Sequence, residues 1–125
     1  MSKIVIDTKN APGAIGPYSQ GIIVGNLVYT SGQLPIDIAT GELVQEVKSA
    51  TKASLDNIKA ILEEAGTSMD NIFKTTVFVK DLNDFNAVNE VYATYFKSNP
   101  PARSCVQVAK LPKDAVIEIE AIAVL

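Results

Sequence analysis

The stretch "PPARSCVQVAKLPKDAVIEIEAIAVL", residues 100–125, contains the strongest indication of the fold. Two runs of mostly apolar or small residues flank a Pro-containing break, which predicts two strands joined by a short turn. Because successive strand residues face opposite sides, Arg103 and Cys105 share one face of the first strand. Glu118 and Glu120 share one face of the second strand. The stretch therefore places charge within apolar strands, and that charge needs an explanation.

Two interpretations of these charges stay open on the pattern alone. An antiparallel hairpin would let the Arg103 end of one strand approach the glutamates of the other, giving a solvent-exposed ion pair of little energetic value. Alternatively, Arg103 lies in a cleft and binds a carboxylate through two parallel hydrogen bonds. Glu118 or Glu120 would then orient or activate a water molecule.

The rest of the chain predicts a βββ-α-β-α-ββ order and the α+β class. Apolar periodicity indicates a long first helix ending before Gly66, and Asn83 is a plausible N-cap for the second helix. Gly25-Asn26 is a two-residue hairpin signal. Besides the two strands of residues 100–125, we expect strands near residues 3–7, 21–24, 27–30 and 71–81. The two helices are expected at residues 46–65 and 84–97.

This element order favours one mixed sheet with the two helices packed on one face. The other face also carries apolar residues, and the chain offers no further helix to cover it. Self-association is the economical way to bury that face.

Composition narrows the function classes. A chain of 125 residues with 47% hydrophobic residues is expected to form a single domain, residues 1–125. The chain has no histidine, which excludes Ser-His-Asp and Cys-His catalysis and, with one cysteine, an ordinary zinc site. A net charge of −3 without a basic run argues against broad nucleic-acid binding.

The compartment can also be inferred from the sequence. The first ten residues, "MSKIVIDTKN", lack the apolar segment of a signal peptide, and no run is long and apolar enough to cross a bilayer. The lone Cys105 has no partner for an internal disulfide, as is usual in a reducing compartment. We therefore expect a cytoplasmic protein.

Further candidate residues each have a structural and a functional reading. Tyr18 in "GPYSQG" is typical of a packing residue with its hydroxyl at the edge. Ser31-Gly32 in "YTSGQLP" fits a turn, but it can also present a hydroxyl and a backbone N–H to a ligand anion. Asn89 interrupts the apolar stripe of the second helix, so its amide needs a partner in a neighbouring loop or in a ligand. Cys105 is more often a buried small side chain than a nucleophile.

Taken together, these motifs resemble the Rid family of reactive intermediate deaminases, also called YjgF-like proteins. The resemblance rests on P-A-R-S-x-V-x-x-A-x-L followed by I-E-I-E, and on "GPYSQG", "YTSGQLPID" and "NEVYATYF" in that order. The resemblance covers essentially the whole chain. Within the family, the chain is most similar to the RidA subgroup. The resemblance implies a chorismate-mutase-like fold and a homotrimer with a small-molecule cleft at each subunit interface.

The resemblance also implies roles for residues. Arg103 would bind the carboxylate of a 2-imino acid and Glu118 would orient the attacking water. Five further residues would line the cleft: Tyr18, Ser31, Gly32, Asn89 and Cys105. Hydrolysis would convert 2-aminoacrylate and related products of pyridoxal-phosphate-dependent dehydratases to 2-keto acids and ammonia, with no metal or organic cofactor.

Other functions remain open at this stage. Some relatives with intact pockets serve as sensors, so a non-catalytic module that binds a small carboxylate and regulates a partner is the main alternative. An endoribonuclease or translation-inhibitor activity is weakened by the acidic pI of 4.8 and the missing histidine. Surface charge neither favours nor opposes a chaperone role.

Overall fold

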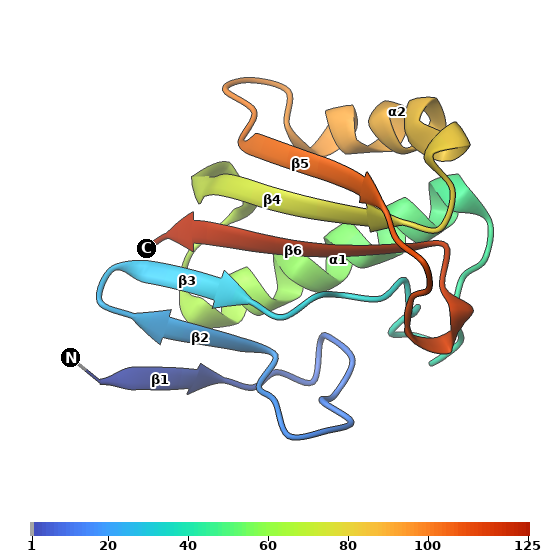
Figure 1. The fold of residues 1–125 in the computed structure, drawn as a ribbon. Coiled ribbons are helices and arrows are strands. Elements are labelled where there is room, and N and C mark those ends of the chain that lie inside the picture. Colours follow the sequence, from blue (N-terminus) through green and yellow to red (C-terminus); the bar gives the residue numbers. More distant parts are fainter. Residues whose placement is uncertain (1) are drawn as a thin grey trace.

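A computed structural model describes residues 2–125 as one six-stranded sheet and two α-helices in the predicted βββ-α-β-α-ββ order (Figure 1). The α+β class is confirmed. The strands are β1 Lys3–Ile6, β2 Gly21–Val24, β3 Leu27–Thr30, β4 Ile72–Val79, β5 Ala102–Gln107 and β6 Ile117–Val124. The helices are α1 Val47–Ala65 and α2 Phe85–Tyr95.

The strand order β1-β2-β3-β6-β4-β5 differs from the sequence prediction at one edge of the sheet. β5 and β6 were expected to pair as a hairpin, but β4 lies between them and pairs with both, parallel to β5 and antiparallel to β6. The hairpin prediction is therefore wrong. The remaining strand pairs are antiparallel, so the sheet is mixed.

The helices cover one face of the sheet, as predicted, and Figure 1 shows α1 running behind the strands. The core on that face combines aliphatic side chains of α1 with those of β3, β4 and β6. Its largest fully buried apolar members are Leu55, Ile58, Ile61, Leu62, Val28, Val77, Val79, Val88, Ile117 and Ile119. Within residues 2–125, no helix has the length and apolar character that a bilayer crossing requires.

The predicted C-terminal end of α1 is confirmed, and the helix starts one residue later than predicted, at Val47. The Glu46 carboxylate accepts hydrogen bonds from the backbone N–H groups of Lys48 and Ser49, at 2.6 and 3.2 Å. Gly66 ends the helix with a φ of 90°, a conformation that glycine adopts without strain.

The predicted N-cap of α2 is wrong, although the helix starts within one residue of the predicted position. Asn83 is not its N-cap: its backbone N–H donates to the Asp81 carboxylate at 2.9 Å, so Asp81 begins a 3₁₀ turn at Leu82–Asp84. The α-helix begins only at Phe85, after that turn, and ends at Tyr95 rather than at Lys97.

The face of the sheet opposite the helices is open and largely apolar. Tyr29 and Val106 are each 43% exposed there, and Val5 is 56% exposed. The strand register places Glu118 and Glu120 on this same face. In the described chain, the predicted uncovered sheet face is therefore present.

Candidate functional site

Arg103 on β5 faces α2, and three α2 side chains fix its guanidinium. One of its terminal N–H groups donates to the Asn89 side-chain oxygen at 2.7 Å. The guanidinium carbon lies 4.7 Å from the centre of the Tyr92 ring and 5.4 Å from that of Phe85. Cation–π contacts of this kind attract and orient a guanidinium. The face of α2 that carries Asn89 therefore holds the Arg103 guanidinium in place.

Within residues 2–125, Arg103 has no carboxylate partner. The ion pairs of this part of the chain join Lys48 to Glu90, Lys52 to Asp56 and Lys80 to Asp114. A guanidinium has five N–H donors, and the bond to Asn89 uses only one terminal nitrogen. The remaining donors can take a carboxylate in the bidentate geometry that arginine favours.

Cys105 lies two residues farther along β5 on the same face as Arg103 and is half-buried. Burial raises the pKa of its thiol, and the nearby Arg103 charge opposes that rise. A thiol with a raised pKa is a weak nucleophile at neutral pH. Cys105 therefore suits a non-covalent contact beside Arg103 better than a covalent role.

Glu118 on β6 lies on the open face of the sheet and packs against Gly32. A Cβ atom at position 32 would come within 2.5 Å of the Glu118 Oε1 atom, so glycine is what lets the carboxylate lie there. Partial burial raises the pKa of Glu118, and the negative charge of Glu120 raises it further. A carboxylate with a raised pKa is a better general base than an ordinary exposed glutamate.

Backbone bridges hold Gly32 beside Glu118. The backbone N–H of Gln33 donates to the carbonyl oxygen of Ile119 at 2.7 Å, and the reverse bond is 3.2 Å long. The Ser31 hydroxyl donates to the Ser19 carbonyl oxygen at 2.6 Å. Ser31 therefore ties the end of β3 to the preceding loop.

The loop that carries Tyr18 is organised by the buried side chain of Gln20. Its amide nitrogen donates to the carbonyl oxygens of Thr8 and Pro12 at 3.0 and 2.8 Å, and its oxygen accepts from the Thr8 N–H at 2.7 Å. Tyr18 and Gly32 line one small pocket of about 60 Å³. Tyr18, Ser31, Gly32 and Glu118 thus form a second group of predicted residues.

The two groups are separate within one chain. Arg103, Asn89 and Cys105 lie on the helix-covered side of β5, whereas Glu118 lies on the opposite face of β6, with β4 between these strands. The ion pair between Arg103 and the glutamates, one of the two interpretations above, is therefore absent from residues 2–125.

Sequence reasoning missed part of this arrangement. Phe85 and Tyr92 belong to the apolar stripe that Asn89 interrupts, and in the structure they flank the Arg103 guanidinium. The Tyr92 hydroxyl shares a 2.7 Å hydrogen bond with that of Thr75, the β4 residue beside Arg103. The signal was available, because aromatic residues four before and three after Asn89 share its helix face.

Other features of the described residues do not join these groups. A cavity of about 270 Å³ lies between α1 and the segment 36–44, and none of the predicted site residues lines it. Within residues 2–125, no three acidic or cysteine side chains lie close enough together to hold a metal ion.

Comparisons with known proteins place the chain among relatives of similar length. The family described as Endoribonuclease L-PSP matches residues 8–125. The Escherichia coli protein named 2-iminobutanoate/2-iminopropanoate deaminase is 58% identical over 127 aligned positions, covering 99% of this chain and 98% of the relative.

Two solved E. coli structures have the same fold. The YjgF gene product is 56% identical, with a TM-score of 0.94 over 97% of this chain and 98% of its own. TdcF, crystallised with bound serine, is 53% identical, with a TM-score of 0.94 over 98% of each chain.

Proposed function

Because this chain belongs to the Endoribonuclease L-PSP family, we propose that it is a deaminase that hydrolyses 2-iminobutanoate and 2-iminopropanoate to 2-keto acids and ammonia. The E. coli relative that carries this activity in its name is 58% identical over nearly the full chain. The substrates include the enamine 2-aminoacrylate, which dehydratases release and which tautomerises to 2-iminopropanoate.

The observation that carries the proposal is the half-buried Arg103, which has no acidic partner within residues 2–125. Asn89 and two aromatic rings hold its guanidinium in one orientation. In the proposed site Arg103 binds the substrate carboxylate by a charge-assisted hydrogen bond, worth about 1.5–3 kcal/mol. E. coli TdcF, a relative with bound serine, supports a ligand of this size and charge.

Glu118 supplies the general base in the proposed reaction. It accepts a proton from water as the water oxygen attacks C2 of the imine, and the resulting tetrahedral carbinolamine takes up a proton at nitrogen and expels ammonia. Carbonyl formation completes the hydrolysis, so water is the only co-reactant. General base catalysis contributes roughly 10²–10⁴-fold in rate, which is sufficient for an imine that already hydrolyses quickly.

We further propose that the complete site forms between subunits of a homotrimer. Arg103 and Glu118 lie on opposite faces of the sheet in one chain, so a ligand that touches both requires a second copy or a path around the sheet edge. The open face with exposed Tyr29 and Val106 supplies apolar surface for subunit association. The proposal treats residues 1–125 as one RidA-like domain and places it in the cytoplasm.

The test generates 2-aminoacrylate in situ with a serine dehydratase and traps surviving imine with semicarbazide. We expect wild type to suppress semicarbazone formation and Arg103→Ala to lose this effect, with unchanged secondary structure and oligomeric size. Lys59→Gln is the matched control, because it removes one positive charge from an exposed site on α1.

Two outcomes would overturn the assignment. The first is near wild-type hydrolysis by Arg103→Ala. The second is wild-type protein that binds 2-ketobutanoate but does not turn over the imine, which would favour the alternative of a carboxylate-sensing module. We test this alternative because the solved structure of the relative TdcF contains bound serine.

A further inference from the structure

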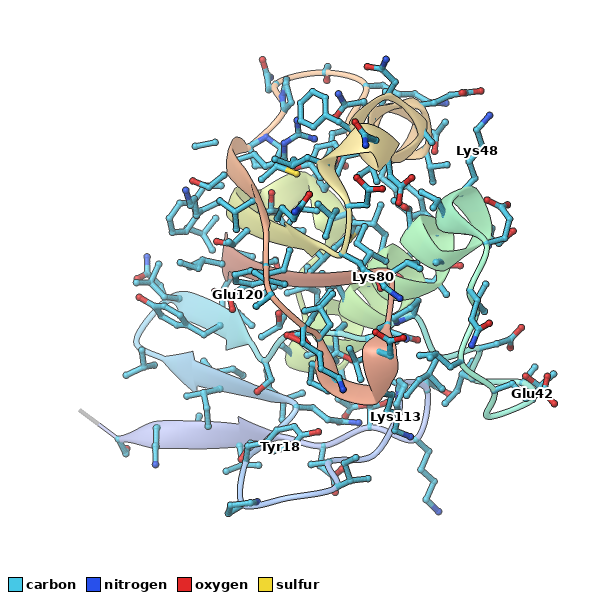
Figure 2. The ribbon with its side chains drawn as sticks, turned by 45° about the vertical axis from the view of Figure 1, so that its right-hand side comes forward. Tyr18, Glu42, Lys48, Lys80, Lys113 and Glu120 are labelled. Carbon is cyan, nitrogen blue, oxygen red and sulfur yellow. The ribbon has the colours of Figure 1, made fainter. Side chains whose placement is uncertain are left out.

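Among residues 2–125, Lys113 is the only charged residue lining the small pocket that contains Tyr18 and Gly32. The rest of the lining is uncharged and consists of apolar side chains, glycine and the amides of Gln20 and Gln33. Figure 2 shows Lys113 and Tyr18 at the same end of the molecule, the lower end in that view. Lys113 is exposed, so it lies at the rim of the pocket rather than in its interior.

The backbone holds Lys113 in an uncommon conformation. Lys113 and Asp114 both have positive φ values, 58° and 55°, which non-glycine residues rarely adopt. The turn is fixed on both sides, since Leu111 is 5% and Ala115 1% exposed. Strain of this kind persists where the surrounding structure enforces it, and it often occurs at functional sites.

The two charged residues of this turn, Lys113 and Asp114, differ in their contacts. The Asp114 carboxylate accepts a 3.0 Å hydrogen bond from the Lys80 ammonium in an ion pair, so Asp114 anchors the turn. Lys113 forms no ion pair within residues 2–125. Its ammonium group is therefore available to an anion at the pocket rim.

The pocket adjoins the proposed general base, because Gly32 lines it and also contacts Glu118. A volume of about 60 Å³ accommodates roughly two water-sized groups. If C2 of a 2-imino acid lies beside Glu118, its side chain can place one or two carbons in the pocket. A group at the end of such a side chain then reaches the rim, where Lys113 offers a donor.

We propose that Lys113 determines specificity by binding the side-chain carboxylate of dicarboxylic 2-imino acids, the imines of acidic amino acids. This inference rests on the proposed deaminase function and extends its substrate class beyond short apolar side chains. Arg103 binds the carboxylate next to C2, and Lys113 binds the second one.

The test measures binding of two stable keto acids, oxaloacetate and 2-ketobutanoate, by calorimetry in metal-free buffer. We expect Lys113→Met to weaken oxaloacetate binding about fivefold, as for a solvent-exposed ion pair, and to leave 2-ketobutanoate binding within about twofold. Lys113→Arg, which keeps the charge, restores the preference. Lys110→Met is the matched control, because Lys110 is exposed on the same connection but does not line the pocket.

Equal effects of Lys113→Met on the two ligands, or no effect on either, would overturn the inference. A loss that Lys113→Arg does not restore would indicate a structural role and would overturn it as well. Failure of the deaminase proposal is distinguishable, because wild type would then show no imine hydrolysis whatever the Lys113 variants do. The ratio of kcat/KM for 2-iminosuccinate and 2-iminobutanoate should follow the binding ratio.

Discussion

At the scale of single residues, the environment of Glu118 connects structure to chemistry most directly. Its pKa is raised first by partial burial against Gly32 and second by the like charge of Glu120. Glu120 forms no ion pair within residues 2–125, so its charge is not neutralised there. A raised pKa shifts ionisation of the proposed base to higher pH.

We predict that Glu120→Gln moves the acidic limb of the pH profile of kcat/KM to lower pH. The base acts when it is ionised, so activity falls as the pH drops through its pKa. Removing the Glu120 charge lowers that pKa, and activity then persists to lower pH. Glu63→Gln, which removes an exposed acid on α1, should leave the limb in place. A limb that stays fixed or moves upward in Glu120→Gln would contradict the assignment of Glu118.

The residues of the candidate site were more predictable than their partners. Arg103, Glu118 and Asn89 stood out because each interrupts an apolar pattern, which is visible in the sequence alone. The buried Gln20, which organises the Tyr18 loop, gave no such signal. Its hydrogen bonds go to backbone carbonyls up to 12 residues away, and this depends on loop geometry rather than on periodicity.

At the scale of elements, local patterns predicted strands and helices but not their neighbours. Buried and more exposed residues alternate along β6. This alternation is the same whether β6 pairs with β4 or with β5, because it reflects only which face of the strand is buried. The connection between β5 and β6 spans nine residues, 108–116, counted from the end of one strand to the start of the next. Hairpin loops are usually shorter, at about two to five residues, so this length argued against a hairpin.

The α1 helix contains one side chain whose energetics can be tested directly. Ser54 is fully buried, and within residues 2–125 its hydroxyl has no hydrogen-bond partner. We predict that Ser54→Ala raises the free energy of unfolding by about 1 kcal/mol, since it removes an unsatisfied polar group and improves helix propensity. Urea denaturation measures this as a higher midpoint at unchanged slope.

Ser49→Ala is the control on the same helix. Its hydroxyl is exposed and hydrogen-bonded to Glu46 at 3.1 Å, so its removal should be neutral or slightly destabilising. If Ser54→Ala instead lowered the urea midpoint, the Ser54 hydroxyl would have a partner such as a buried water, and the prediction would fail.

At the scale of the whole molecule, the two sides of the sheet have different tasks. The covered side contains the core and orients Arg103 through α2, whereas the open side carries Glu118 within an apolar surface. Counting helices against sheet faces predicted the uncovered face from the sequence. The division of the site between the faces was not predictable, because it depends on β4 lying between β5 and β6.

This division yields a prediction for mixed oligomers of two inactive variants, Arg103→Ala and Glu118→Gln. If each site takes its arginine from one subunit and its glutamate from another, random 1:1 mixing leaves about one quarter of the sites intact. Co-refolded variants should therefore regain about a quarter of the wild-type rate in the semicarbazide assay, although each alone is inactive. Mixing Arg103→Ala with Arg103→Gln is the control, because no mixed site then contains the arginine. Mixed trimers verified by native mass spectrometry that recover no activity would show that Arg103 and Glu118 of one chain serve the same site.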